Sequence, residues 1–109
     1  MVKGTIVLEG DYGLEYKRTC WSVVEGSPLC VVDGHSDIPH FAGSRYRIAH
    51  RASARSIIKT NSKPKAIAMM RRLLKWKGVD WSWDVERIRL NTTREQVFAA
   101  AGYDPNAAN

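Results

Sequence analysis

The residues best placed to do chemistry in this sequence are cationic, and they gather in the middle of the chain. No Asp or Glu occurs between Asp37 and Asp80, and residues 38–79 carry a net charge of +11. The rest of the chain carries −5, so that the whole sequence has a net charge of +6. A small protein polarised in this way attracts polyanions.

Phosphate recognition requires several cations on one surface, because affinity for nucleic acid grows with the number of phosphates neutralised. Arginine grips a phosphate at two points, and aromatic rings offer planes on which bases stack. We therefore expect a non-enzymatic protein that engages nucleic acid, or an assembly containing it, through segment 38–79. The predicted nucleic-acid-binding residues are Arg45, Arg47, Arg51, Arg55, Lys59, Arg71, Arg72, Lys75 and Lys77, with Tyr46 and Trp76 stacking on or shielding the ligand.

No zinc-finger, KH or RNP signature accompanies these charges, so the prediction rests on electrostatics and leaves other interpretations open. The same basic face would suit a protein-binding module or inhibitor that docks on an acidic or nucleic-acid-binding partner protein, as small proteins of viruses and mobile elements do. Such an interface should depend on anchors such as Trp76 or Tyr46. The charges could also form only a solvated basic surface, or be used in head-to-tail self-association.

A third interpretation is a small metal-dependent nuclease. Asp33, His35, Asp37 and His40 lie close together in the sequence, with His50 further on, and such side chains can ligate a metal or share a proton. The competing interpretation is a polar loop with ordinary turn chemistry, which we favour. No nucleophile elbow or glycine-rich phosphate loop is present, so nothing requires an enzyme, and we expect no cofactor.

The elements that must position these residues begin with a β-rich third of the chain. Residues 3–9, 14–24 and 29–32 are predicted strands of an antiparallel meander, and residues 33–44 an irregular loop. Segment 45–60 is ambiguous, and we expect a strand or coil start followed by a helix from about Ala52. In a helix Arg47, Arg51, Arg55 and Lys59 would form one basic stripe.

The clearest helix is predicted over residues 63–77. Asn61 or Ser62 can cap it, Pro64 suits its first turn, and Gly78 ends it. Residues 79–85 alternate as a strand does, with Trp81 and Trp83 on its core face, and this face continues to Leu90. Thr92 and Glu95 indicate a capping box for a short helix over residues 93–101.

These elements predict an α+β fold: a single small domain over residues 1–102, with a tail at 103–109. An antiparallel sheet of three to five strands packs on the main helix (63–77) and the short C-terminal helix (93–101). Cys20 and Cys30 are interpreted as buried thiols that act as small hydrophobes and not as a disulfide. With no apolar run long enough for a membrane and no signal sequence, we expect a cytoplasmic protein.

Overall fold

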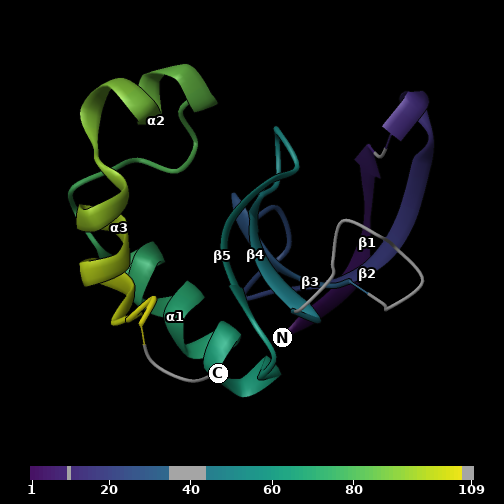
Figure 1. The fold of residues 1–109 in the computed structure, drawn as a ribbon, viewed down its shortest axis with the longest axis horizontal. Coiled ribbons are helices and arrows are strands. Elements are labelled where there is room, and N and C mark those ends of the chain that lie inside the picture. The colour runs from purple at the N-terminus through teal and green to yellow at the C-terminus, as the bar shows by residue number, and fades with distance from the viewer. Residues whose placement is uncertain (10, 35–43, 107–109) are drawn as a thin grey trace.

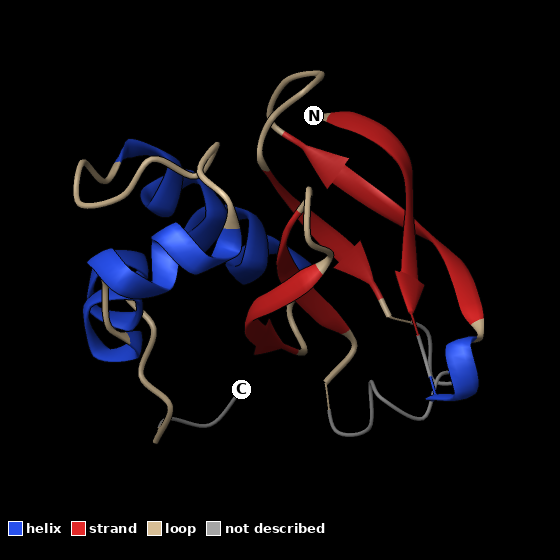
Figure 2. Cartoon of the chain, turned by 90° about the horizontal axis from the view of Figure 1, so that it is seen from above, coloured by secondary structure: helices blue, strands red, loops and turns tan. Residues whose placement is uncertain are grey.

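The computed structural model of the chain describes residues 1–9, 11–34 and 44–106, and it is built from one sheet and three helices. The five strands run in the order β1 to β5, and every neighbouring pair is antiparallel. The helices lie together on one side of the sheet (Figures 1 and 2). The strands are β1 (Val2–Glu9), β2 (Glu15–Ser22), β3 (Leu29–Asp33), β4 (Tyr46–His50) and β5 (Arg55–Thr60); the helices are α1 (Lys63–Lys75), α2 (Val85–Asn91) and α3 (Arg94–Ala101), and a short 3-10 turn, η1, covers Asp11–Gly13.

This architecture confirms the predicted α+β class, with a five-stranded antiparallel sheet, a main helix and a short C-terminal helix. The helix α1 begins as expected: Ser62 is its N-cap, the Ser62 hydroxyl accepts a hydrogen bond from the backbone N–H of Lys65, and Pro64 lies in the first turn. It ends at Lys75, with Trp76 and not Gly78 as the capping residue. Within the described ranges, no helix has both the length and the apolar character to cross a membrane.

The helix expected within segment 45–60 is wrong, because this segment forms the paired strands β4 and β5. The alternation of side chains explains the outcome: Tyr46 and Ile48 face the helices, while Arg47 and Ala49 face the other way. Burial of Ile48 beside Ile58 on the neighbouring strand outweighs the local helical preference.

The strand expected over residues 79–85, with its continuation to Leu90, is also wrong. Residues 79–84 are irregular, and α2 follows. The polar residues of the alternating pattern act locally: the Asp80 carboxylate accepts hydrogen bonds from the Ser82 backbone N–H and hydroxyl, and Asp84 is the N-cap of α2. The capping box of α3 lies one residue further on than expected, between Thr93 and Gln96.

The sheet buries apolar side chains on both faces. Its helix face joins the helices in the main core, which includes Leu29, Val31, Ile48 and Ile58 together with α1 residues such as Met70. The opposite face, which we call the far face, carries a smaller buried cluster of strand residues: Ile6, Cys20, Cys30, Val32 and Ala49. The tryptophan prediction for the core holds, since Trp81 is buried and Trp76 and Trp83 are half-buried against it.

The buried residue Trp81 connects three parts of the fold. Its backbone carbonyl accepts a hydrogen bond from Nε2 of His50 at 2.9 Å, and its indole Nε1–H donates to the carbonyl of Leu73 at 2.9 Å. The other ring nitrogen of His50, Nδ1, lies 2.8 Å from the hydroxyl of Ser53. Strand β4, helix α1 and the segment leading to α2 are thereby held together by satisfied polar groups in the interior.

Replacing His50 by alanine should lower the free energy of unfolding by about 1–3 kcal/mol, because the buried carbonyl of Trp81 loses its donor. Urea unfolding followed by tryptophan fluorescence measures the change. The Ser53→Ala variant is the matched control and should cost less, since Ser53 is only half-buried and contacts the outward side of the ring. Equal stability of His50→Ala and the parent protein would contradict this structural role.

Candidate nucleic-acid interface

Strand pairing brings cations from separate parts of the sequence onto the far face. Arg47 and Lys59 are direct register partners on β4 and β5, and the row across the sheet continues through Val32 to Cys20. Arg51 follows β4, and its guanidinium donates a hydrogen bond to Sγ of Cys20 at 3.4 Å. The expected helical stripe is therefore wrong, because these residues lie on and beside strands. Three of its four members, Arg47, Arg51 and Lys59, still share one face.

The environment of these groups is set by burial and by their mutual repulsion. Burial lowers the pKa of Arg47, which is half-buried. The pKa of Lys59 is lowered chiefly by the positive charge of Arg47, and less by burial. The hydrogen bond to Cys20 raises the pKa of Arg51. Like charges that face each other across neighbouring strands destabilise the pairing of those strands, and Arg47 and Lys59 are such a pair.

Two far-face residues that the sequence analysis missed lie outside segment 38–79. Arg18 and Tyr16 on β2 fall on the same side of the strand as Cys20, and the Arg18 guanidinium lies 5.5 Å from the centre of the Tyr16 ring. The alternation Tyr16, Arg18, Cys20 was a visible signal, but only the strand register shows which face it joins. We call Arg18, Arg47, Arg51 and Lys59 the far-face cluster.

Arg45 and Tyr46 are used elsewhere. The Arg45 guanidinium forms a two-point ion pair with the carboxylate of Asp33, at 3.0 and 3.2 Å, which raises the pKa of Arg45, and it lies 5.2 Å from the Tyr46 ring centre. Tyr46 is on the helix face, with its ring 6.5 Å from that of Trp21. Neither residue lies with the far-face cluster.

The remaining predicted residues lie on the helical side or at the β4–β5 turn. Arg55 is exposed beside that turn, and the cations of α1 diverge: Arg71 contacts Sδ of Met1, whereas Arg72 donates to the carbonyl of Ala101 at the end of α3. Lys75 and Lys77 are exposed, and Trp76 is half-buried with its ring against Gly78. The charges of segment 38–79 are thus divided between opposite sides of the sheet.

The residues of the nuclease hypothesis are described only in part. Asp33 pairs with Arg45, while His35, Asp37 and His40 lie outside the described residues. His50 is buried and bonded within the core. Residues 1–9, 11–34 and 44–106 contain no group of three or more His, Cys, Asp or Glu side chains that could hold a metal ion.

Cys20 and Cys30 are free, buried thiols on the far face, as expected. Burial raises the pKa of Cys30 to about 12, and the neighbouring Cys20 thiol adds to this effect, while the charge of Arg51 opposes it. The Cys30 thiol therefore stays neutral at physiological pH, and both buried cysteine side chains act as packing beneath the guanidinium of Arg51.

Comparison of this chain with protein-family models, curated proteins and solved structures finds no match.

The raised pKa of Cys30 predicts a loss of stability at alkaline pH. The unfolded thiol loses its proton at about pH 9, whereas the folded one keeps it to about pH 12, so the stabilisation is complete below pH 9 and declines as the pH rises to 12. In this window the free energy of unfolding should fall by up to about 1.4 kcal/mol per pH unit more in the parent protein than in Cys30→Ala. Urea unfolding from about pH 8 to about pH 11 tests this; identical slopes would show that Cys30 does not titrate as described.

Proposed function

We propose that this chain is a non-enzymatic nucleic-acid-binding protein and that the far-face cluster contacts the phosphate backbone. The observation that carries the proposal is the pairing of Arg47 with Lys59 in direct register on neighbouring strands. Their repulsion, expressed in the lowered pKa of Lys59, costs stability in the free protein. An anion placed between the two groups would convert this repulsion into attraction and would favour the charged form of Lys59.

The extent of the cluster favours a chain of phosphates over a single small anion. Arg18 lies on β2 and Lys59 on β5, three strand spacings apart, which corresponds to about 14 Å across the sheet. A ligand that reaches all four cations must therefore carry negative charge at repeated intervals, as a nucleic-acid backbone does.

An aromatic ring accompanies these charges on the far face. Tyr16 is half-buried beside Arg18 and packs against the far-face apolar cluster, which holds its ring in place. A sheet face that combines cations with a fixed aromatic ring suits single strands, because unpaired bases can stack on the ring while the phosphates meet the cations. Tyr16 thus takes the stacking role that the sequence analysis gave to Tyr46 and Trp76.

The double variant Arg47→Gln/Lys59→Gln should weaken binding of labelled single-stranded DNA or RNA by about tenfold or more, since it removes two phosphate contacts. Fluorescence anisotropy at fixed salt measures the affinity. The matched control is Lys65→Gln/Lys75→Gln, which removes the same charge from exposed positions of α1 on the other side of the sheet. Equal losses in the two variants would mean that only net charge matters and would contradict the far-face site. If the Arg47 change unfolds the protein, the exposed Lys59→Gln variant serves alone.

The salt dependence gives a second, independent prediction. A plot of the logarithm of the binding constant against the logarithm of salt concentration should be linear, and each far-face cation replaced should reduce its slope by about 1. The Tyr16→Leu variant should instead lower the affinity for single strands and leave the slope unchanged, since stacking releases no counterions. Binding that disappears at about 150 mM salt in the parent protein would reject the proposed function.

A further inference from the structure

The strand β5 lies at one edge of the sheet. It is the last strand in the order, and among residues 1–9, 11–34 and 44–106 it pairs with β4 alone, so its outer backbone edge has no strand partner there. Such an edge presents backbone N–H and C=O groups that can pair with another extended chain. The register with β4 passes from Ile48–Ile58 to Ala49–Ser56, so Ile57 is an extra residue, a bulge that changes the local direction of the strand.

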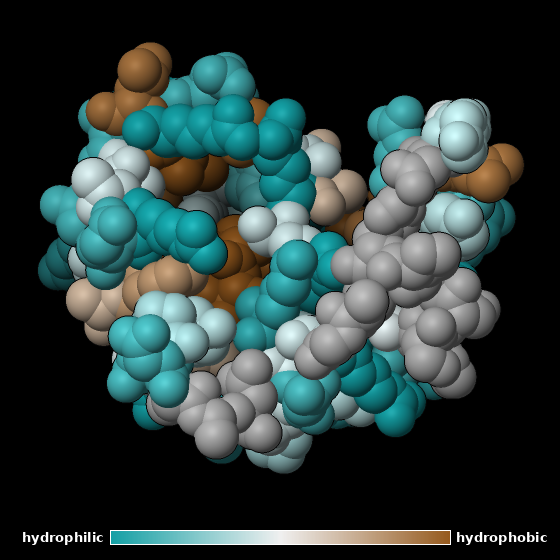
Figure 3. Space-filling model, in the orientation of Figure 1, coloured by the Kyte–Doolittle hydropathy of each residue, from teal (hydrophilic) through white to brown (hydrophobic). Residues whose placement is uncertain are grey.

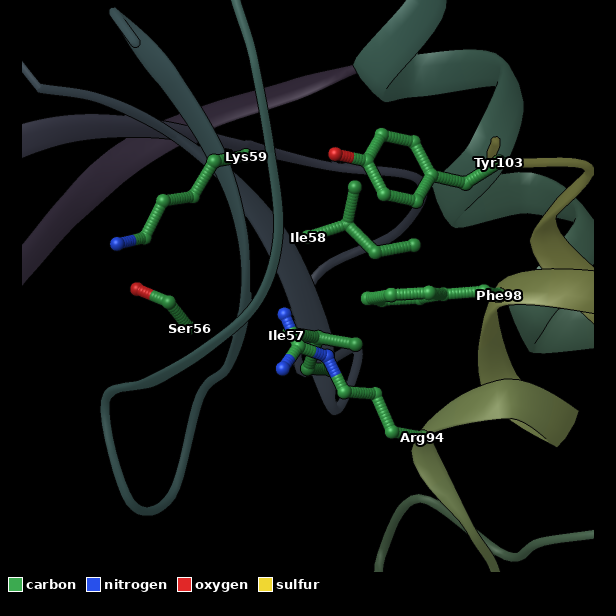
Figure 4. Close-up of a pocket in the computed structure, with 7 residues that line it drawn as sticks. All are labelled: Ser56, Ile57, Ile58, Lys59, Arg94, Phe98 and Tyr103. Atoms are coloured by element: carbon green, nitrogen blue, oxygen red, sulfur yellow. The ribbon is translucent and has the colours of Figure 1, made fainter. Parts of the chain in front are cut away.

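A cavity of about 380 Å³ lies along this edge. Ser56, Ile57, Ile58 and Lys59 line it on one side, and α3 with the residues after it supplies the other. These four consecutive residues send side chains to both faces of the sheet, so they can line one cavity only if the backbone edge itself forms its wall. Figure 4 agrees: Ser56 and Lys59 extend to one side of β5, and Ile58 extends to the other, toward Phe98 and Tyr103.

A second cavity, of about 240 Å³, continues the first between β5 and the helices. The two share Ser56, Ile57, Arg94 and Phe98. We call their union the β5–α3 groove. Its deeper residues are apolar and include Trp81, Ile88 and Val97. Figure 3 shows apolar side chains at the bottom of a hollow between the helical side and the sheet, surrounded by polar residues.

The wall of the groove opposite β5 is held in place by aromatic packing. The rings of Phe98 and Tyr103 meet edge to face with their centres 4.8 Å apart, and the backbone N–H of Tyr103 donates to the carbonyl of Phe98. The guanidinium of Arg94 lies 5.1 Å from the Phe98 ring centre. Tyr103, the first residue of the predicted tail, is therefore part of this wall, which offers an apolar ring beside a cation.

The charges of the groove select the chemistry of its occupant. In the part of the chain that the structure describes, the charged residues that line the two cavities are Lys59, Arg89 and Arg94, all cationic. Of these, Arg89 lies 3.6 Å from the carboxylate of Glu86. An acidic segment complements this rim. A second copy of the chain does not, because antiparallel pairing of β5 with itself would place two cationic rims side by side.

We propose that the β5–α3 groove binds an extended acidic peptide segment of a partner protein, which adds to β5 as a sixth strand. Backbone hydrogen bonds to the β5 edge would provide the affinity, as in other cases of strand addition. Alternate apolar side chains enter the groove beside Phe98, and the intervening carboxylates meet Lys59 on the opposite face, with Arg94 at the rim. This site is distinct from the nucleic-acid surface, with which it shares only Lys59.

The test uses a fluorescein-labelled peptide in which Glu alternates with Val around a central Phe, titrated into the full chain without nucleic acid. We expect saturable binding, with NMR shifts and slowed amide exchange confined to β5 and α3. A peptide of the same sequence with its alternate backbone nitrogens methylated keeps the charge and loses the donors, and it should bind at least about tenfold more weakly. A peptide with Lys in place of Glu should not bind.

The matched protein variants are Arg94→Gln and Arg87→Gln. Each removes one positive charge from the helical layer, but Arg87 lies outside the groove, with its guanidinium 4.1 Å from the Trp83 ring centre. We expect Arg94→Gln to weaken peptide binding by about fivefold or more and Arg87→Gln to leave it unchanged. Arg18→Gln should also leave it unchanged, which separates this result from the nucleic-acid proposal.

Four outcomes would overturn the proposal. They are the absence of peptide binding up to millimolar concentration, equal binding of the methylated peptide, equal binding of the lysine peptide, and equal losses in Arg94→Gln and Arg87→Gln. Sedimentation of the chain alone tests the other occupant. If the chain forms a dimer that the Phe98→Ala variant does not form and that the peptide dissociates, the groove is occupied by a second copy.

Discussion

The hydrogen bonds around Trp81 are the constraint on which the arrangement of this protein depends. Its carbonyl and indole N–H are both buried, and each would cost free energy if left without a partner. Because His50 on β4 and Leu73 on α1 supply those partners, the segment between α1 and α2 is held against the sheet. The placement of α2 and α3 beside β5 follows from this contact, and so does the groove, which Trp81 also lines.

Strand β5 serves two surfaces because its side chains and its backbone point in different directions. Lys59 extends to the far face, where it meets Arg47, while the outer edge of the same strand borders the groove toward α3. The helix face is occupied by Ile58 in the core. One short strand thus contributes to the core, to the proposed nucleic-acid surface and to the proposed peptide site, and the geometry of a strand keeps these roles apart.

The concentration of positive charge near β4 and β5 lowers the stability of the folded protein. Arg47 and Lys59 face each other, and part of the charge on Arg47 is removed from water by burial. The long stems of arginine and lysine side chains can cover apolar surface while the charged groups remain near solvent. On the far face this covering matters, since Arg51 lies over the buried thiol of Cys20 in a cluster whose buried members are all strand residues.

The sequence by itself determined the α+β class, the first three strands, the helix α1 with its Ser62 cap, and the polarised charge, because each depends on local pattern or composition. It predicted the strand start of segment 45–60 but the wrong element from about Ala52 onward, and again for residues 79–90. In both cases local preference was outweighed by contacts with distant residues, such as Ile48 beside Ile58 and Trp81 with His50. Only the tertiary structure decided which cations share a surface. Strand register places Arg18, Arg47 and Lys59 on one face of the sheet, and α1 packs on the other. The spacing of these residues along the sequence does not show which of them share a face.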